Sequence, residues 1–351
     1  MFPDAVSSLP RSIIMSQPGL FDQQEILSRR DKKGDVLARL NSAVEWKVFE
    51  PVIKKALSKD RRSLAGRKSY NPLLMFKVLI LQSLYNMSDD VAEDIVDDRL
   101  TFRRFVGLED SQKSPDATTI WRFREALVEA GVMQELFAVF DRHLAEQGFR
   151  AEKGQIIDAS IVAVPKQRNK PEENKAIKEG NPPEWPEAKK RQKDVDARWT
   201  KKNGTSHFGY KNHISVDVKY KLIRSFEITS AEVHDSRKFE ELLSENTSRD
   251  VYADSAYRSA ESLEKLKELG YREHLQRKGQ KNHSLTKLEK QGNRTKSRSR
   301  SRVEHVFAAQ LQRAGDLVVR TIGLARATVK IGLRNLAYNM DRLGFLLGVQ
   351  G

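Results

Sequence analysis

The spacing of hydrophobic residues divides the chain into a helical first part and a mixed second part. From about residue 36 to residue 149, apolar residues recur with the period of an α-helix. This period predicts helices over 71–87, 88–108, 114–131 and 132–148. Asn71 with Pro72 is a good N-cap and first-turn pair, and Gly131 is a helix stop. The apolar run over 71–87 predicts a buried helix.

Short apolar runs rich in β-branched residues replace the helical period from about residue 153. They predict strands at 154–165, twice within 209–233 around a turn near Lys219–Lys221, at 250–257 and at 271–276. The helical period returns at 235–246, at 259–270 and from 303 to about 346. Strands that alternate with helices in this way indicate a layered α/β domain with a mixed sheet.

These patterns predict three parts of the chain. Residues 1–35 are polar and irregular, so we expect a poorly ordered segment, in which Met15 could serve as an alternative start. Residues 36–150 form a helical domain, whose short helices in series are typical of DNA-binding domains. Residues 151–351 form the α/β domain with its C-terminal helices. A basic, Pro- and Lys-rich loop is inserted into it at 166–206.

The charge balance indicates the kind of partner. Lys and Arg total 63 against 48 Asp and Glu, which gives a net charge of +15 and favours a polyanion such as nucleic acid. Residues 277–302 hold ten Lys or Arg and one acid, Glu289, and we predict a second basic loop there. The absence of Cys excludes disulfides and Cys-ligated metal sites. No membrane span or secretory signal is evident, so we expect a cytoplasmic protein with no membrane partner.

Three carboxylates occur where chemistry could use them. Asp158 sits inside an apolar strand, Asp254 closes another, and Glu304 lies near the first turn of the helix predicted from 303. Each has an ordinary explanation on its own, because an Asp can end a strand and an acid suits a helix start. Together they could bind hard divalent cations, which catalyse phosphoryl transfer.

Several motifs, in order, carry a family resemblance over residues 35–346. The chain resembles DDE transposases of bacterial insertion sequences, specifically the insertion sequence five family. The motifs are YNPLLMFKVLILQSLYNMSDDVAEDIVDDRLTFRRFVGL, SPDATTIWRFREAL, IIDASIVAVP, HFGYKNHISVDVKYKLIRS, AEVHDSR, YADSAY and SRVEHVF.

The resemblance implies an RNase H-like mixed-sheet catalytic core behind the helical domain. It implies a magnesium-dependent triad of Asp158, Asp254 and Glu304, with two ions per active site and manganese able to substitute. A metal-activated water would cut the DNA at the ends of the insertion sequence, and the freed 3′-OH would then attack target DNA. The partners would be double-stranded terminal inverted repeats and target DNA, bound by a homodimer near the bacterial nucleoid.

Seven residues are predicted DNA contacts: Arg298, Arg300, Arg302, Arg313, Lys211, Thr118 and Arg122. Arg300 falls on the Arg position of the family's C-terminal signature. The chain departs from that signature at Ser297, where the family has Tyr, and at Leu311, where it has Lys. Arg313 is the candidate to replace that Lys.

Several residues keep two interpretations. The helix over 114–131 either reads DNA or is a capped core helix, and Trp121 and Phe123 on it are predicted to be core residues. Asp235 in the AEVHDSR motif is equally explained as a helix cap. His305 is expected to pack or to support the site, not to bind metal.

Two rival functions remain open. Another RNase H-like nuclease, such as a junction resolvase, would share the triad without joining DNA. A catalytically impaired DNA-binding regulator would fit the departures at Ser297 and Leu311.

Overall fold

The structure, a computed structural model, describes residues 21–58, 69–109, 111–202, 204–279 and 284–350. Within the predicted poorly ordered segment 1–35, Asp22–Lys32 instead form helix α1, and Met15 lies outside the described residues. Acids in the first turn of α1 and basic residues in its last turn match the helix dipole. None of the helices in the described ranges combines the length and hydropathy that a membrane span requires.

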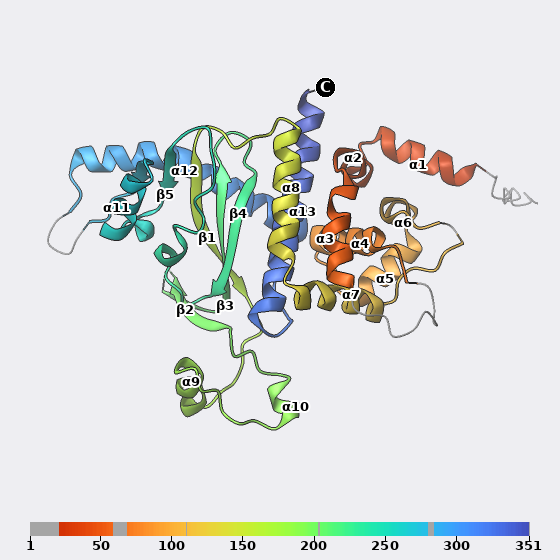
Figure 1. Ribbon diagram of the computed structural model, residues 1–351, viewed down its shortest axis with the longest axis horizontal. Coiled ribbons are helices and arrows are strands. Elements are labelled where there is room, and N and C mark those ends of the chain that lie inside the picture. Colours follow the sequence, from red (N-terminus) through yellow and green to blue (C-terminus); the bar gives the residue numbers. More distant parts are fainter. Residues whose placement is uncertain (1–20, 59–68, 110, 203, 280–283, 351) are drawn as a thin grey trace, which may run out of the picture.

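The helical part lies at one end of the molecule (Figure 1). The elements after α1 are α2 (Val36–Ala43), the 3₁₀ helix η1 (Trp46–Phe49), α3 (Glu50–Leu57), α4 (Pro72–Tyr85), α5 (Asp89–Asp98), α6 (Leu100–Val106), α7 (Ala117–Ala130) and α8 (Met133–Glu146). The run predicted as one helix over 88–108 breaks at Arg99, whose extended backbone separates α5 from α6. Side chains of Asn71, Ser88 and Asp116 cap α4, α5 and α7, and Gly131 ends α7 in the left-handed conformation.

A six-stranded mixed sheet forms the second part. Its strands are β1 (Gln155–Ala163), β2 (Arg198–Lys202), β3 (Thr205–Asp217), β4 (Ile223–Ser230), β5 (Asp250–Ala253) and β6 (Arg272–Leu275). Strand β3 runs antiparallel to β1 and β4, whereas β5 is parallel to β1 and β6 is parallel to β5. The order β4–β3–β1–β5–β6 is that of an RNase H-like core. The predicted fold class is therefore confirmed.

The insert predicted as a basic loop at 166–206 contains regular structure. It holds two short helices, α9 (Pro171–Lys178) and α10 (Glu187–Lys190), and it returns through β2, which pairs with the start of β3. Glu173 fastens the two helices together, because it accepts hydrogen bonds from Trp185 Nε1 at 2.8 Å and Lys189 Nζ at 2.6 Å. Figure 1 shows the insert projecting from the body.

The last helices differ most from the expectations. The basic loop predicted at 277–302 is largely helical, because α12 runs from Lys287 to Ala314. A reciprocal capping box between Thr286 and Glu289 starts α12, and Val303 and Val306 bury its far half against the protein. The helix α13 (Leu324–Gln350) follows.

The predicted helix over 235–246 is reduced to one 3₁₀ turn, η2 (Asp235–Lys238). Tertiary packing overrides the helical period here, because Phe239 and Leu242 enter a small core with Ile157 and Tyr257. The Leu242 carbonyl accepts a hydrogen bond from Ser225 Oγ at 2.9 Å instead of continuing a helix. The 3₁₀ turn η3 (Ser255–Tyr257) and helix α11 (Ala260–Glu268) complete this side.

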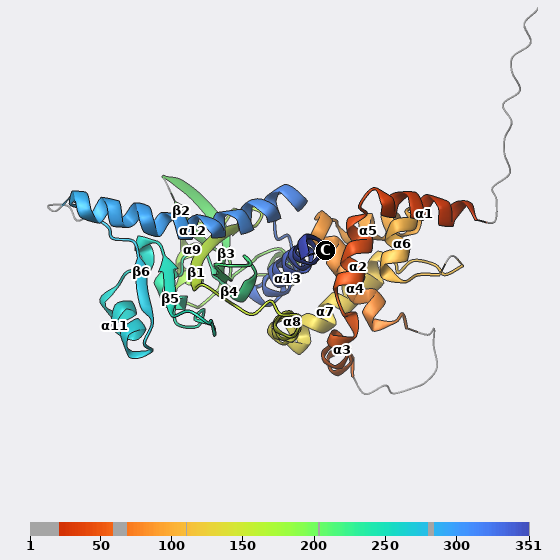
Figure 2. The ribbon, with the colours of Figure 1, turned by 90° about the horizontal axis from the view of Figure 1, so that it is seen from above.

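One hydrophobic core joins the helical part to the sheet. It runs from Leu37 in α2 to Leu343 in α13 and includes residues of β1, β3 and β4. Helix α13 packs against α2, α4, α7 and α8 on one side and against β4 on the other. Figure 2 shows α12 running along the sheet toward α13 and the helical part. The two halves of the chain are therefore built around a shared helix.

Candidate active site

Two aspartates meet where β5 ends beside the middle of β1. The parallel register pairs Ile157 with Ala253, so the next residue on each strand is Asp158 or Asp254. Asp254 also caps η3, because its Oδ1 accepts a hydrogen bond from the Ala256 N–H at 2.8 Å. Strand pairing thus brings together two of the three predicted carboxylates, although 96 residues separate them in the sequence.

The side chain of Arg300 joins the first predicted carboxylate to the third. Its Nη1 donates to Asp158 Oδ2 at 2.9 Å, and its Nη2 donates to Glu304 Oε1 at 3.3 Å. Arg300 and Glu304 are four residues apart on α12 and so lie on the same side of the helix. The buried Nε of Arg300 has no hydrogen-bond partner among the described residues. One guanidinium therefore lies between two acids that come from different parts of the chain.

The surroundings of Asp158 favour a nearby positive charge. Burial raises the pKa of Asp158 to about 6, Arg300 opposes that rise, and the negative charge of Asp254 adds to it. The Asp158 side chain is 16% exposed. A desolvated acid beside a second acid is stabilised as a carboxylate by a cation. In the structure, Arg300 supplies this charge.

Glu304 is placed differently from the two aspartates. It lies in the interior of α12, not in a first turn as predicted, and its side chain is 62% exposed. Within the described residues, no three acidic or histidine side chains converge closely enough to hold a metal ion. The donor chemistry still fits a hard divalent cation, because all three groups offer carboxylate oxygens and Arg300 marks where positive charge is needed.

Tyr257 lies near this site, and the sequence analysis did not find it. Its ring is fully buried, and its hydroxyl has no hydrogen-bond partner in the described ranges. Burial raises the pKa of Tyr257 well above its usual value, and the charges of Asp235, Asp158 and Asp254 add to this rise. The sequence predicts a strand over 250–257, and only the turn at η3 brings this hydroxyl toward the acids.

Two family models match the chain. A model described as "Transposase DDE domain" matches residues 150–340, which is more than half of the chain. The chain belongs to the transposase DDE domain family. A model described as "Transposase domain (DUF772)" matches residues 24–126 of the same transposase.

Among solved structures, the transposase is similar to one described as "Cryo-EM structure of piggyBac transposase synaptic complex with hairpin DNA". The identity is 13%, the match covers 90% of this chain and 76% of that chain, and the TM-score is 0.48. The family models themselves confirm the predicted class, that of a DNA transposition enzyme whose family generally uses divalent metal ions.

The predicted phosphate contacts on α12 do not all face solvent. Arg298 is exposed. Arg302 turns toward the sheet, where its Nη1 donates to the Val218 carbonyl at 2.6 Å. Arg313 is partly buried, and its Nη2 donates to Asp341 Oδ1 at 3.4 Å. Of these three arginines, Arg298 is the one presented to a strand that passes over the transposase.

Lys211 lies on the other face of the sheet from Asp158. Ser160 pairs with Asn212, and side chains alternate along a strand, so Asp158 shares its face with Asn212 and not with Lys211. The Lys211 ammonium donates to Asp235 Oδ1 at 2.8 Å, and its side chain is 12% exposed. The ammonium of Lys211 is thus held by Asp235 in this structure, and its predicted contact with DNA stays a prediction.

Helix α7 exposes the two residues predicted to contact DNA. Thr118 and Arg122 are exposed and lie four residues apart, on one side of the helix. Trp121 lies between them and is 46% exposed, so the prediction that it is a core residue is wrong. Phe123 is buried as predicted, because the opposite face of α7 packs into the helical part. A DNA contact at Thr118 and Arg122 stays a prediction.

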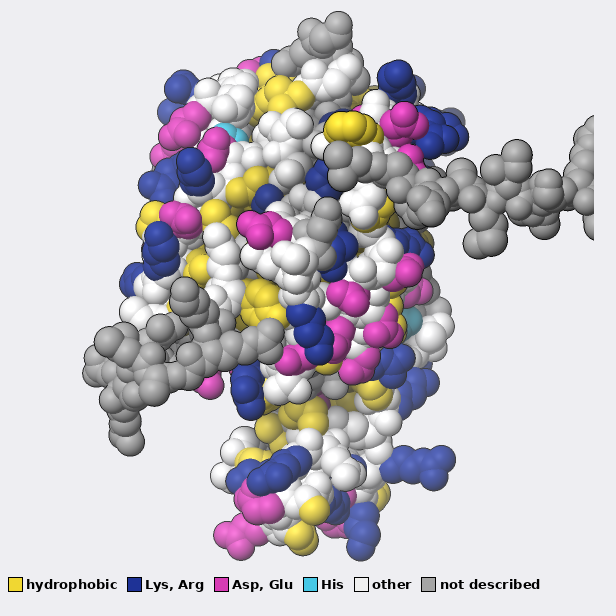
Figure 3. Space-filling model, turned by 90° about the vertical axis from the view of Figure 1, so that its right-hand side faces the viewer, with side chains coloured by type: hydrophobic (Ala, Val, Ile, Leu, Met, Phe, Trp, Pro, Cys, Tyr) yellow, Lys and Arg dark blue, Asp and Glu magenta, His cyan; other side chains and the backbone are white. Residues whose placement is uncertain are grey.

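An acidic surface covers another part of the helical region. Helix α5 has the sequence DDVAEDIVDD and no basic residue. Figure 3 shows acidic side chains gathered on the outer face of the helical part. Those of α5 with exposed or half-exposed positions are Asp89, Asp90, Glu93, Asp94, Asp97 and Asp98. A negatively charged surface of this kind disfavours contact with phosphates.

A row of cations does face solvent along α12. Lys287, Lys290, Arg294 and Arg298, which we call the α12 stripe, are all exposed and follow one another at intervals of three or four residues. Such intervals place them on one side of the helix. Glu289, the acid of this region, accepts a hydrogen bond from Arg277 Nη1 at 2.8 Å. Most of the basic charge of 277–302 is therefore arranged on a helix, not on a loop.

The two departures from the family signature have different surroundings. Ser297 Oγ accepts a hydrogen bond from Gln276 Nε2 at 2.7 Å and so ties the segment after β6 to α12. Leu311 is 50% exposed on the outer side of α12. The replacement predicted for the missing Lys, Arg313, is paired with Asp341 instead of facing outward with Leu311.

Proposed function

We propose that this transposase cuts and joins DNA at Asp158, Asp254 and Glu304, and that it belongs to the insertion sequence five group. The observation that carries the proposal is the pairing of the two aspartates across β1 and β5, with Arg300 joining Asp158 to Glu304. The two aspartates lie at neighbouring positions of adjacent strands, and Arg300 connects Glu304 to the first of them, which supports a shared site.

Asp158 and Asp254 would hold the metal, and Glu304 would complete the set once Arg300 moves aside. Bound Mg²⁺, with Mn²⁺ as a substitute, would activate a water or a 3′-hydroxyl and stabilise the leaving oxygen. The freed Arg300 guanidinium would then bind a phosphate of the strand being cut, because a planar guanidinium makes two parallel hydrogen bonds to phosphate oxygens.

The charged surfaces support a path for the DNA. The α12 stripe leads toward Arg300 and Glu304, and its contacts with phosphates would fix the strand without reading its bases. The acidic face of α5 keeps DNA away from that side of the helical part. Thr118 and Arg122 on α7 are our candidates for recognition of the terminal repeats. Two copies of the chain, one at each end, would assemble on the element.

The proposal is tested with DNA that carries the inverted repeats flanking the coding region. We expect Mg²⁺-dependent nicking at the repeat ends, followed by joining of the 3′-OH to a target plasmid. Asp158→Asn and Asp254→Asn should abolish both reactions. Asp316→Asn, which removes an exposed acid in the loop after α12, is the matched control and should keep them.

Each rival function predicts a different product. Cutting without joined product would identify another RNase H-like nuclease. Tight binding to the repeats without any metal-dependent cut would identify a DNA-binding regulator, and the proposal would then be wrong.

A further inference from the structure

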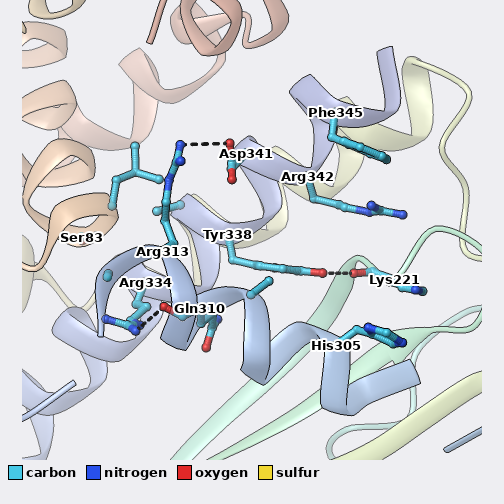
Figure 4. Close-up of a pocket in the computed structure, with 14 residues that line it drawn as sticks. Ser83, Lys221, His305, Gln310, Arg313, Arg334, Tyr338, Asp341, Arg342 and Phe345 are labelled. Carbon is cyan, nitrogen blue, oxygen red and sulfur yellow. Dashed lines mark hydrogen bonds and ion pairs between the residues drawn. The ribbon is translucent and has the colours of Figure 1, made fainter. Parts of the chain in front are cut away.

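A cavity of about 280 Å³ opens on the far side of α12 from the carboxylates. Helices α4, α12 and α13 and the turn after β3 form its walls (Figure 4). The residues of interest in its lining are Lys221, His305, Arg313, Tyr338, Arg342 and Phe345. Glu304 and Arg313 are nine residues apart on α12, or about two and a half turns, so they point to opposite sides of the helix. Helix α12 is therefore a ridge between the candidate active site and this cavity.

One end of the cavity carries positive charge that no acid among the described residues balances. Burial lowers the pKa of Lys221, and the charges of Arg342 and Arg302 lower it further. The Lys221 ammonium has no ion pair or hydrogen bond among the described residues, and Arg342 uses its Nε on the Tyr220 carbonyl at 2.8 Å. Repulsion among cations that are held together in this way is relieved by an anion.

Asp341, the acid in the cavity lining, lies at the opposite end of the cavity from Lys221 and Arg342. Asp341 pairs with Arg313 at 3.4 Å and with Arg39 at 3.6 Å. Figure 4 shows Arg313 and Asp341 at one end, with Lys221, Arg342, Phe345 and His305 at the other. The unbalanced end is thus the one next to His305, the residue that follows Glu304.

Aromatic rings lie beside these cations. Phe345 is 50% exposed, and the Arg342 guanidinium lies 4.9 Å from its ring centroid. The Tyr338 hydroxyl donates to the Lys221 carbonyl at 2.7 Å, which fixes its ring across the middle of the cavity. An exposed ring stacked with a guanidinium, next to free cations, is the combination that binds a base and its phosphate.

We propose that this cavity binds one unpaired nucleotide of a DNA strand whose bond to be cut lies at the carboxylates across α12. Lys221 and Arg342 hold its phosphate, and Phe345 stacks on its base. The exposed His305 lies on the ridge between the two sites, so a strand that crosses α12, about 10 Å wide with its side chains, reaches both. The inference rests on the proposed function, because it needs a strand at Glu304.

The test uses the full chain without divalent cations, so that no DNA is cut. The probe is a DNA duplex with a single-stranded overhang that contains the fluorescent base 2-aminopurine. We expect binding to quench the probe, because an aromatic ring stacks on the base. Phe345→Leu should remove most of the quenching, and Lys221→Gln should weaken overhang binding about tenfold, the loss of one charged phosphate contact.

Matched control variants separate this site from general effects on the protein. Phe21→Leu removes another exposed ring, and Lys219→Gln removes an ammonium two residues from Lys221 that pairs with Glu152. Both controls should quench and bind the probe as the wild type does. Quenching that survives Phe345→Leu, or equal losses in control and test variants, overturns the proposal.

Competition identifies the ligand. A deoxynucleoside 5′-monophosphate should restore fluorescence at concentrations where inorganic phosphate or the nucleoside alone does not. Equal competition by phosphate means that the cavity binds only an anion, and the nucleotide assignment is then wrong. If the wild type nicks repeat DNA but the overhang probe behaves identically in all variants, only this inference fails. If the wild type binds no DNA, the proposed function fails and this inference fails with it.

Discussion

Replacing Asp158 with asparagine should stabilise the protein while it removes the proposed catalysis. The folded structure raises the pKa of this carboxyl from 3.8 to about 6. Each pKa unit corresponds to about 1.36 kcal/mol, so the ionised carboxylate costs the folded state about 3 kcal/mol at pH 7.5. Asparagine resembles the protonated acid and avoids most of this cost. Over 351 residues, an unfolding entropy of roughly 2 cal/mol/K per residue converts 3 kcal/mol to about 4 °C in Tm.

The pH dependence has a definite sign. An acid whose pKa is raised by folding contributes its full stability below the unfolded pKa and loses it as pH rises through the folded pKa. The gain from Asp158→Asn should therefore fall to about 1 kcal/mol at pH 4.5. Thermal denaturation in EDTA at pH 7.5 and pH 4.5 measures this gain in stability. Glu304→Gln, which changes an exposed side chain, is the control and should alter stability by less than about 0.5 kcal/mol. An Asp158→Asn protein no more stable than the wild type at pH 7.5 would refute the reasoning.

Three further predictions concern stability and DNA binding. Asp89→Ala leaves Arg124, which is 4% exposed, without its two 2.7 Å hydrogen bonds to Asp89. The free energy of unfolding, measured by thermal denaturation, should fall by about 3–5 kcal/mol, and a loss below about 1 kcal/mol would contradict this. Arg294→Gln combined with Arg298→Gln should reduce the slope of log affinity against log salt by about 1.8 for duplex DNA, and an unchanged slope would exclude the α12 stripe as a contact. Gly154→Ala should lower Tm, because residue 154 has φ +95° and the new Cβ would lie 2.6 Å from a β5 carbonyl oxygen; an unaltered Tm would show that the strands can separate locally.

Local signals explain what the sequence could predict. Asn71 and Gly131 mark helix ends by side-chain capping and by a left-handed backbone, and both act within a few residues. The β-branched runs gave most strands for the same reason. The Ser/Arg alternation of 297–302 carries no such signal, and this segment is helical because a capping box starts α12 further upstream and Val303 and Val306 anchor it downstream.

The arrangement of the candidate site depends on contacts that cross the chain. Asp158 and Asp254 could be chosen as acids in apolar strands, but their proximity follows from the β1–β5 register. The sequence predicted that Arg300 contacts DNA, whereas in the structure its guanidinium donates hydrogen bonds to Asp158 and Glu304. Tyr257 gave no signal, because a turn of three residues decides where its hydroxyl lies.

The position of α13 in the shared core also constrains how the protein is made. This helix packs against α2, α4, α7 and α8, yet the ribosome synthesises it only after the whole sheet. Domains generally fold in the order in which they emerge, and the helical part emerges first. The apolar surface of the helical part that α13 covers therefore stays exposed, or is bound by a chaperone, until α13 has been synthesised. A nascent chain that is interrupted before residue 324 would lack a helix that contributes to the core of both halves, so we expect its truncated product to fold less stably than the full chain.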